Sequence, residues 1–348
     1  MNSSRVLKRN EFYVFVTIAA LCVVIQFQSG QFFTNNNIVD IARSMIVPGM
    51  LAMGLMMEII AGGIDVSFPS VAMLSMYSSI MIMQRMDYSG SAFFGFLIST
   101  GIGLFLGLIN GLLVHWLKLP AFIITLGTGS ICRGFMQAVL KSRNISILPL
   151  PIANLGKKYL FTVTNQDVGL SSPLPFVFLF LVIVVLGVAF ILRYTILGRG
   201  IYALGGDSVA ATRAGFNILG IELFVYGFMG ALAGFVGLTR TALTGSCQPT
   251  SFIGYEMTVI AAVVLGGTRI SGGSGTVTGT LLGTLLLTMV SNSLILLGIP
   301  TYWGKFTTGV MIVIGTGMSA WQALQRKKRL TSVVSSAKRM ITGNQDGK

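Results

Sequence analysis

Few residues of this chain have side chains suited to acid-base, nucleophilic or metal chemistry. The 348 residues include a single histidine, His115, and ten acidic residues. Nucleophilic and metal-dependent sites need several such groups close together, and the sequence shows neither a Ser-His-Asp or Cys-His arrangement nor a metal-ligand spacing. The stretch "GIPTYWGKF" at 298–306 has five residues between its glycines and Phe306 where a phosphate loop has a magnesium-binding hydroxyl. We therefore expect no catalysis and no cofactor, and a membrane-embedded enzyme is the weakest functional class.

A small set of polar residues lies within or beside apolar segments, where polar groups are costly and often functional. Asp65 either has a functional role or, as we favour, caps the next helix by accepting from the amides of Ser67 or Phe68. Glu58 and Arg133 either pair with each other or face a polar path. Hydrogen bonding between helices is the other common use of such groups. The candidate residues for a translocation path are Asp65, Ser67, Ser70, Asn110, Thr125, Thr128 and Asn292.

The composition indicates that membrane-spanning helices position these residues. Hydrophobic residues make up 53% of the chain and charged residues 10%, whereas soluble domains carry about 25% charged residues. Apolar runs near 20 residues recur, each long enough to cross a hydrocarbon core of about 30 Å. We predict an all-α polytopic protein with an N-terminus at 1–11, a transmembrane domain at 12–324 and a basic tail at 325–348. The ten expected spans are 12–28, 39–60, 64–83, 92–115, 120–140, 174–193, 219–242, 254–268, 275–297 and 304–324.

The net charge of +14 reflects orientation in a membrane rather than nucleic-acid binding. Three basic residues precede the first span, and seven of the 24 follow residue 325. Basic residues accumulate on the cytoplasmic side, and ten spans place 15 of them inside and eight outside. Both termini and Ser208 are therefore expected in the cytoplasm, with Ser89 and Asn165 outside. The chain is therefore expected to be a multi-pass membrane protein with both termini on the cytoplasmic side.

An internal repeat connects two glycine-rich turns. The frame Gly-Gly-x-x-(Val/Ile)-Ser-x-x-Ser occurs at 62–70 and again at 266–274, an offset of 204 residues. Such repeats are common in transporters. We expect discontinuous helices at these turns, because irregular backbone at membrane depth is tolerated where it is buried or lines a cavity. The alternative for the turns is that they are ordinary cytoplasmic turns, and the alternative for the repeat is chance similarity. With ten spans the two copies have the same orientation in the membrane, so the repeat is parallel. An inverted repeat would require one of the span boundaries to be wrong.

A polar segment at 195–218, "TILGRGIYALGGDSVAATRAGFNI", interrupts two apolar runs on the basic side. Asp207 or Ser208 is a good N-cap for a short helix, and Gly215 is a good C-terminal stop. The short side chains on this helix suit a shallow cleft on another protein, while a solvated loop is the alternative. We expect Ala210 and Ala211 on the short helix that docks, and the sequence does not fix which of the two faces the partner.

This segment resembles the cytoplasmic coupling segment of permease subunits of bacterial ABC importers for monosaccharides, of the ribose, xylose, galactose and autoinducer-2 type. The resemblance covers nearly the whole chain: "GGIDVS" at 62–67, "LPAFIITLGT" at 119–128, "RG" at 133–134, "GRGIYALGGDSVAATRAG" at 198–215 and "IAAVVLGGTRISGGSGTVTGTLLG" at 260–283. Phe68 and Pro69 stand where the family usually has a smaller apolar residue and a glycine. Asp207 replaces a usual asparagine and Ala214 a usual serine.

The resemblance implies a permease that forms the path for a monosaccharide or similar polyol and pairs with a second permease, identical or similar. It also implies cytoplasmic ABC ATPase subunits that bind the ATP and a periplasmic sugar-binding protein that delivers the ligand. An ion-coupled secondary transporter is the alternative, but the chain has few mid-membrane acidic residues to serve it. The residues implied in coupling to the ATPase are Gly198, Arg199, Gly205, Gly206, Asp207, Ala210, Ala211 and Gly215.

Overall fold

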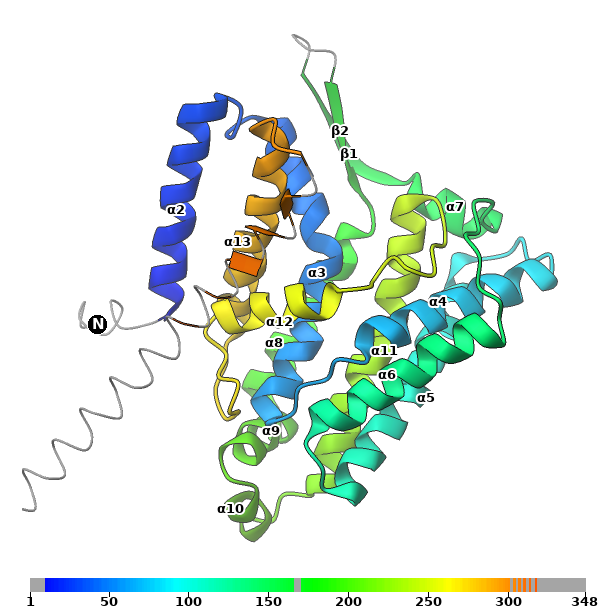
Figure 1. Cartoon of the computed structure of the whole chain (residues 1–348), viewed down its shortest axis with the longest axis vertical. Helices are drawn as coiled ribbons and strands as arrows, with labels where there is room; N and C mark the ends of the chain where they lie inside the picture. Colours follow the sequence, from blue (N-terminus) through cyan, green and yellow to red (C-terminus); the bar gives the residue numbers. More distant parts are fainter. Residues whose placement is uncertain are drawn as a thin grey trace, which may run out of the picture.

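The structure is a helical bundle with one β-hairpin (Figure 1). The computed structural model describes residues 10–165 and 170–300 and eight separate positions between 303 and 317. The strands are β1 (Tyr159–Asn165) and β2 (Leu170–Pro175). The helices are α2 (Asn10–Ser29), α3 (Asn35–Ala61), α4 (Phe68–Arg85), α5 (Ala92–Leu117), α6 (Ala121–Ala138), α7 (Leu150–Gly156), α8 (Phe178–Tyr194), α9 (Ile196–Gly206), α10 (Ser208–Arg213), α11 (Ile218–Thr244), α12 (Tyr255–Leu265) and α13 (Val277–Leu296).

The polytopic all-α prediction is confirmed at the level of class, with fewer full-length spans than expected. Five described helices, α2, α3, α5, α11 and α13, are long and apolar enough to cross a membrane. The pair α8 and α9 makes a sixth if it counts as one span bent by 76°. The expected spans at 64–83, 120–140 and 254–268 coincide with α4, α6 and α12, which do not meet these criteria. The expected span at 304–324 lies mostly outside the described residues.

The three weaker helices differ from the others in polarity or length. Helices α4 and α6 have 18 residues each, and both carry several serine, threonine or charged side chains. Helix α12 has 11 residues, which at 1.5 Å per residue is about 16 Å and half of the hydrocarbon core. Apolar runs in the sequence extend beyond these helices into the adjoining turns, which is why composition alone predicted longer spans.

The main core surrounds α3, which packs against α8, α11 and α13 and is buried over most of its length. Methionine side chains fill much of it. Helices α5 and α11 approach most closely at glycines, because a Cβ on Gly103 would meet the carbonyl oxygen of Gly230 and one on Gly234 would meet that of Ser99. In the sequence Gly103, Gly107 and Gly111 recur at four-residue spacing, a pattern that predicts close helix packing, and these contacts confirm that prediction.

Helices α2 and α13 pack together around a smaller core that includes Ile18, Ile25 and Leu286. At the start of α2, the Glu11 carboxylate accepts hydrogen bonds from the hydroxyls of Thr276 (2.6 Å) and Thr278 (3.1 Å). The first described residues of the chain therefore lie at the turn that precedes α13.

The hairpin is the element that the sequence prediction omitted. Strands β1 and β2 pair antiparallel between α7 and α8, in a segment treated as an outer loop. The Asn36 amide at the start of α3 donates to Ser172 Oγ (3.2 Å), and Ser172 donates to Asp40 Oδ2 (3.2 Å), so α3 holds the hairpin in place. Figure 1 shows the hairpin at one end of the molecule and α10 at the other.

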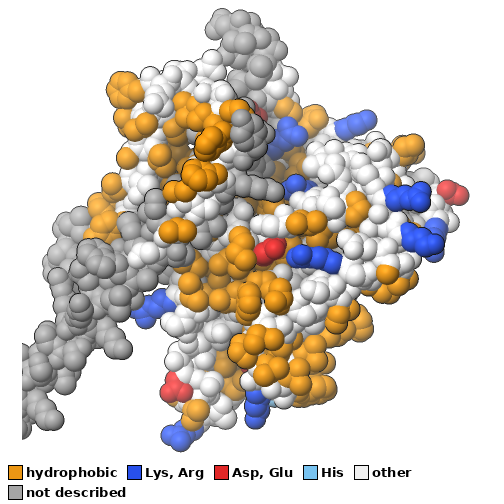
Figure 2. All heavy atoms as spheres, in the orientation of Figure 1, with side chains coloured by type: hydrophobic (Ala, Val, Ile, Leu, Met, Phe, Trp, Pro, Cys, Tyr) orange, Lys and Arg blue, Asp and Glu red, His pale blue; other side chains and the backbone are white. Residues whose placement is uncertain are grey.

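Much of the exterior is apolar. Figure 2 shows hydrophobic side chains spread over one face of the molecule, with lysine and arginine gathered in scattered groups. Helix α6 contributes several of the exposed side chains, among them Phe122, Ile131 and Phe135. A surface of this kind needs lipid or protein cover.

Candidate coupling and translocation site

The polar segment at 195–218 forms two short helices, α9 and α10, joined at Asp207. The Thr195 side chain accepts from Gly198 N (3.0 Å) and begins α9. The Asp207 carboxylate accepts from the amides of Val209 (2.9 Å) and Ala210 (3.1 Å) and begins α10. Gly215 has φ of +85°, a conformation that glycine adopts at little cost. The predicted cap at Asp207 and stop at Gly215 are therefore confirmed as geometry.

The outward face of α10 is narrower than expected. Ala210 is exposed and Val209 is 58% exposed, whereas Ala211 is 2% exposed and packs within the chain. The sequence left open which of Ala210 and Ala211 faces a partner, and burial of Ala211 against this chain favours Ala210. The candidate docking face is thus Val209 and Ala210, beside the exposed Gly206 and Asp207.

The inner face of α9 contacts both glycine turns at once. A Cβ on Gly205 would collide with the Ile60 carbonyl oxygen, at the end of α3, and would lie 2.7 Å from Gly273 N. Gly273 N itself donates to the Ile60 carbonyl oxygen (2.9 Å). The Tyr202 hydroxyl donates to the Gly275 carbonyl oxygen (2.9 Å). We call Ile60, Tyr202, Gly205, Gly273 and Gly275 the α9 junction.

The eight residues expected in coupling divide into two groups. Gly198, Gly205 and Ala211 pack inside the chain; a Cβ on Gly198 would meet the Ile191 carbonyl oxygen, at the end of α8. The other five are exposed: Arg199, Gly206, Asp207, Ala210 and Gly215. Sequence reasoning missed Tyr202, although it lies inside the quoted segment 198–215 and its ring was the one aromatic signal there.

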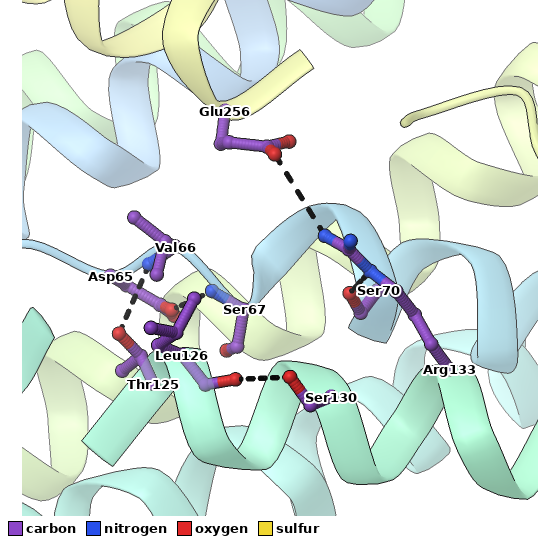
Figure 3. Close-up of polar contacts among 9 residues, drawn as sticks. All are labelled: Asp65, Val66, Ser67, Ser70, Thr125, Leu126, Ser130, Arg133 and Glu256. Carbon is purple, nitrogen blue, oxygen red and sulfur yellow. Dashed lines mark hydrogen bonds and ion pairs between the residues drawn. The ribbon is translucent and has the colours of Figure 1, made fainter. Parts of the chain in front are cut away.

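The first glycine turn is held by buried polar side chains (Figure 3). Asp65 Oδ1 accepts from Ser67 N (2.5 Å), so the predicted hydrogen bond is confirmed, although the N-cap residue of α4 is Ser67 itself. The Thr125 hydroxyl on α6 accepts from Val66 N (3.1 Å), and the Asn110 amide on α5 donates to Ser67 Oγ (2.8 Å). These contacts replace the helical hydrogen bonds that the turn lacks.

Arg133 is a residue of α6, and its side chain reaches Ser70 on α4, next to this turn. Its Nε donates to Ser70 Oγ (2.7 Å), and its Nη2 lies 3.8 Å from Glu256 Oε1 on α12 (Figure 3). The expected alternative of a pair between Arg133 and Glu58 is wrong. Glu58 is fully buried on α3, and neither of its carboxylate oxygens has a hydrogen-bond partner among the described residues. Sequence reasoning missed Glu256 as the partner, because nothing in a sequence pairs two residues so far apart.

Five of the seven candidate path residues gather at this turn: Asp65, Ser67, Ser70, Asn110 and Thr125. All five are buried. Thr128 lies on the same helix as Thr125 and donates to the Thr125 carbonyl oxygen (3.3 Å). Asn292 lies apart, on α13, where its Oδ1 accepts from Ser44 Oγ (3.3 Å). The cluster supports a discontinuous helix, and path lining by these residues stays a prediction.

The contacts of this site join helices and turns to one another and do not form the side-chain arrangement of a catalytic centre. Among the described ranges, no three histidine, cysteine or acidic side chains lie close enough to hold a metal ion. The one close pair with a histidine, His115 Nδ1 with Glu222 Oε2 (2.7 Å), joins the ends of α5 and α11 near the start of α6.

Comparison with known proteins places the chain in a family. Residues 37–315 match the family described as branched-chain amino acid transport system, permease component. The ribose import permease protein RbsC of Bacillus subtilis is 33% identical over 90% of this chain and 92% of its own length. RbsC of Escherichia coli is 32% identical over 86% and 90%. The autoinducer 2 import system permease protein LsrC of Photorhabdus laumondii is 30% identical over 88% of each chain.

No solved structure matches the chain. The family match and the relatives each cover most of this chain. Both describe permease components of transport systems, which carry out transport and do not catalyse a reaction. The chain therefore belongs to the family of permease components of binding-protein-dependent transport systems, and it is a membrane-embedded permease subunit rather than an enzyme.

Proposed function

We propose that the chain forms part of the path for a monosaccharide or similar small polyol, and that the exposed face of α10 docks on a cytoplasmic ATPase. The observation that carries the proposal is the α9 junction. One short helix, α9, contacts the end of α3 and the turn before α13, while the next helix, α10, presents an exposed apolar face. A movement imposed on α10 would reach both glycine turns through α9.

The ATPase supplies the chemistry in this scheme, and the permease supplies a change of shape. The partner subunit binds ATP together with its magnesium ion, and that subunit also provides the catalytic groups. A periplasmic binding protein delivers the ligand at the hairpin end. The names of the relatives favour ribose and autoinducer 2 over the amino acids in the family description, because these relatives match 90% and 88% of this chain.

The membrane arrangement that we infer has ten crossings, with α4, α6 and α12 completed by their adjoining turns. Both glycine turns meet at Gly205, and Glu11 at the start of α2 reaches the second turn. Two like turns on the same side of the bundle favour a parallel repeat over an inverted one. They also favour an N-terminus on the side of α10, which would be the cytoplasmic side of the bacterial plasma membrane.

A second permease subunit would cover the exposed row of α6. Phe122, Ile131 and Phe135 are each more than 40% exposed, which is more apolar surface than a helix facing its own bundle presents. A second copy of this chain or a similar permease would suit it. The measured mass of the intact complex distinguishes a second copy of this chain from a different permease subunit.

The orientation predicts which cysteine substitutions react from outside. Ser89→Cys and Asn165→Cys should react with an impermeant thiol reagent in intact cells, and Ser208→Cys should react only after the membrane is opened. The native cysteines are replaced first, although burial raises the pKa of Cys247 to about 12 and makes that thiol unreactive. If Ser208→Cys reacted with the reagent added outside intact cells, the proposed orientation in the membrane would be wrong.

Uptake should require a separate ATPase. Purified permease in liposomes, combined with its ATPase and a sugar-loaded binding protein, should accumulate labelled sugar only when ATP is present on the α10 side. The same liposomes without ATPase should accumulate none under a proton or sodium gradient. Accumulation driven by an ion gradient alone would favour secondary transport and overturn the proposed function.

A further inference from the structure

A cavity of about 470 Å³ lies at the end of the bundle away from α10. Its polar lining comes from the second half of α6, the segment that follows it and the loop between α11 and α12. Helix α11 begins beside α10 and is 27 residues long, so its far end lies about 40 Å away. The side chains that matter below are Arg133, Gln137, Asn144, Gln248, Met73 and Met136.

The two rims of the cavity are fastened to each other. Ile145 N donates to the Cys247 carbonyl oxygen (3.0 Å), and Cys247 N donates back to Ile145 (2.9 Å). The Tyr77 hydroxyl accepts from Arg143 N (3.0 Å). A cavity held open by backbone hydrogen bonds is a formed site rather than a gap between mobile loops.

The lining has the chemistry that hydroxyl groups need. The amides of Gln137, Asn144 and Gln248 each offer a donor and an acceptor in one plane, which matches a pair of neighbouring hydroxyls. The Gln137 and Asn144 side chains are exposed and make no hydrogen bond within the described part of the chain. Ile253 is 54% exposed in the lining and offers apolar surface for the C–H face of a sugar ring, while Met73 and Met136 are buried behind the cavity wall.

The charges at the floor of the cavity disfavour an amino acid. Arg133 is the one cationic side chain among the lining residues, and it already has Glu256 at 3.8 Å and Ser70 at 2.7 Å. A zwitterion would need a free cation for its carboxylate and a free anion for its ammonium group. A neutral ligand needs neither and leaves the pair intact.

We propose that this cavity is the subsite of the permease that receives a neutral polyhydroxylated ligand from the outer side, with the amides of Gln137, Asn144 and Gln248 binding its hydroxyls. The inference rests on the proposed function and adds a place and a ligand class to it. Arg133 connects the cavity to the first glycine turn through Ser70. From Gln137 through Arg133 and Gly129 to Thr125, one face of α6 leads from the cavity to the turn.

The first test measures access and protection on the permease alone. In a cysteine-free background, Gln137→Cys should react with an impermeant thiol reagent added from the hairpin side, and ribose or a related polyol should slow the reaction. Leucine should not slow it. Gln31→Cys, at the same end but outside the cavity, should react at a rate that none of these compounds changes.

The second test measures transport. Replacing Gln137 or Gln248 by alanine should lower the rate of ATP-driven sugar uptake by about two- to tenfold, the value of one hydrogen bond, with ATPase association unchanged. Gln31→Ala should transport normally. The inference fails if Gln137→Cys is inaccessible, if leucine protects it instead of sugars, or if Gln137→Ala and Gln248→Ala both transport normally. None of these results touches the ATP requirement, whose loss would refute the proposed function separately.

Discussion

Gly205→Ala is expected to reduce ATP-driven uptake by about tenfold or more while leaving the chain in the membrane. The added Cβ would collide with the carbonyl oxygen of Ile60 and would lie 2.7 Å from Gly273 N. Both neighbours are backbone atoms, which cannot rotate away as a side chain can. Overpacking of this kind typically costs about 1–3 kcal/mol, and each 1.4 kcal/mol is about a factor of ten in an equilibrium. Helix α9 must therefore move away from at least one glycine turn.

The adjacent glycine provides a matched control. Nothing lies within 4 Å of a Cβ built on Gly206, and its φ is not positive. Gly206→Ala should transport like the wild type. The measurements are uptake into proteoliposomes and ATPase activity of the purified complex, and we expect hydrolysis without transport for Gly205→Ala. Equal uptake by the two variants would show that the α9 junction does not transmit movement.

Local signals in the sequence gave the most reliable predictions. The hydrogen bond from Ser67 N to Asp65, the cap at Asp207 and the stop at Gly215 each depend on a side chain or a glycine and its near neighbours in the chain. The glycines of α5 at four-residue spacing indicated close packing because helix geometry places them on one face. Each of these predictions depends only on residues that lie within about two helical turns of one another in the sequence. Contacts with the rest of the fold therefore did not change them.

The predictions that failed depended on contacts between distant segments. Arg133 pairs with Glu256 rather than Glu58, and no local pattern distinguishes the two acids. The lengths of α4, α6 and α12 depend on where the turns break the helices. The hairpin was the one missed element with a local signal, because "YLFTVTN" at 159–165 is rich in the aromatic and β-branched residues of strands.

The cavity proposed for the ligand illustrates a further limit. Gln137 is a polar residue inside the expected span 120–140, but Asn144 and Gln248 lie in loops, where amide side chains are common. Their importance depends on the backbone pairing of Ile145 with Cys247, which joins segments about 100 residues apart. A sequence without an alignment carries no trace of that pairing.

Ala210→Glu is the second substitution expected to have a large effect, and it acts on the ATPase rather than on the junction. Ala210 is exposed on a short helix whose neighbouring Val209 is 58% exposed. If the ATPase covers this face, a glutamate there becomes a buried charge without a partner. Unpaired interfacial charges cost on the order of 2–5 kcal/mol, which weakens association by about 30-fold or more.

The variants around Ala210 separate docking from folding. Ala210→Glu should lose the ATPase on purification and lose uptake, yet insert and fold normally, because the side chain points away from its own chain. Ala211→Glu should instead destabilise α10 itself, since Ala211 is 2% exposed within the chain, and its thermal unfolding temperature should fall even without ATPase. Ser89→Glu, on an exposed turn at the other end, should change neither. Full ATPase association by Ala210→Glu would mean that α10 is a solvated segment and that coupling uses another surface, because no docked face of small side chains could accept the added charge.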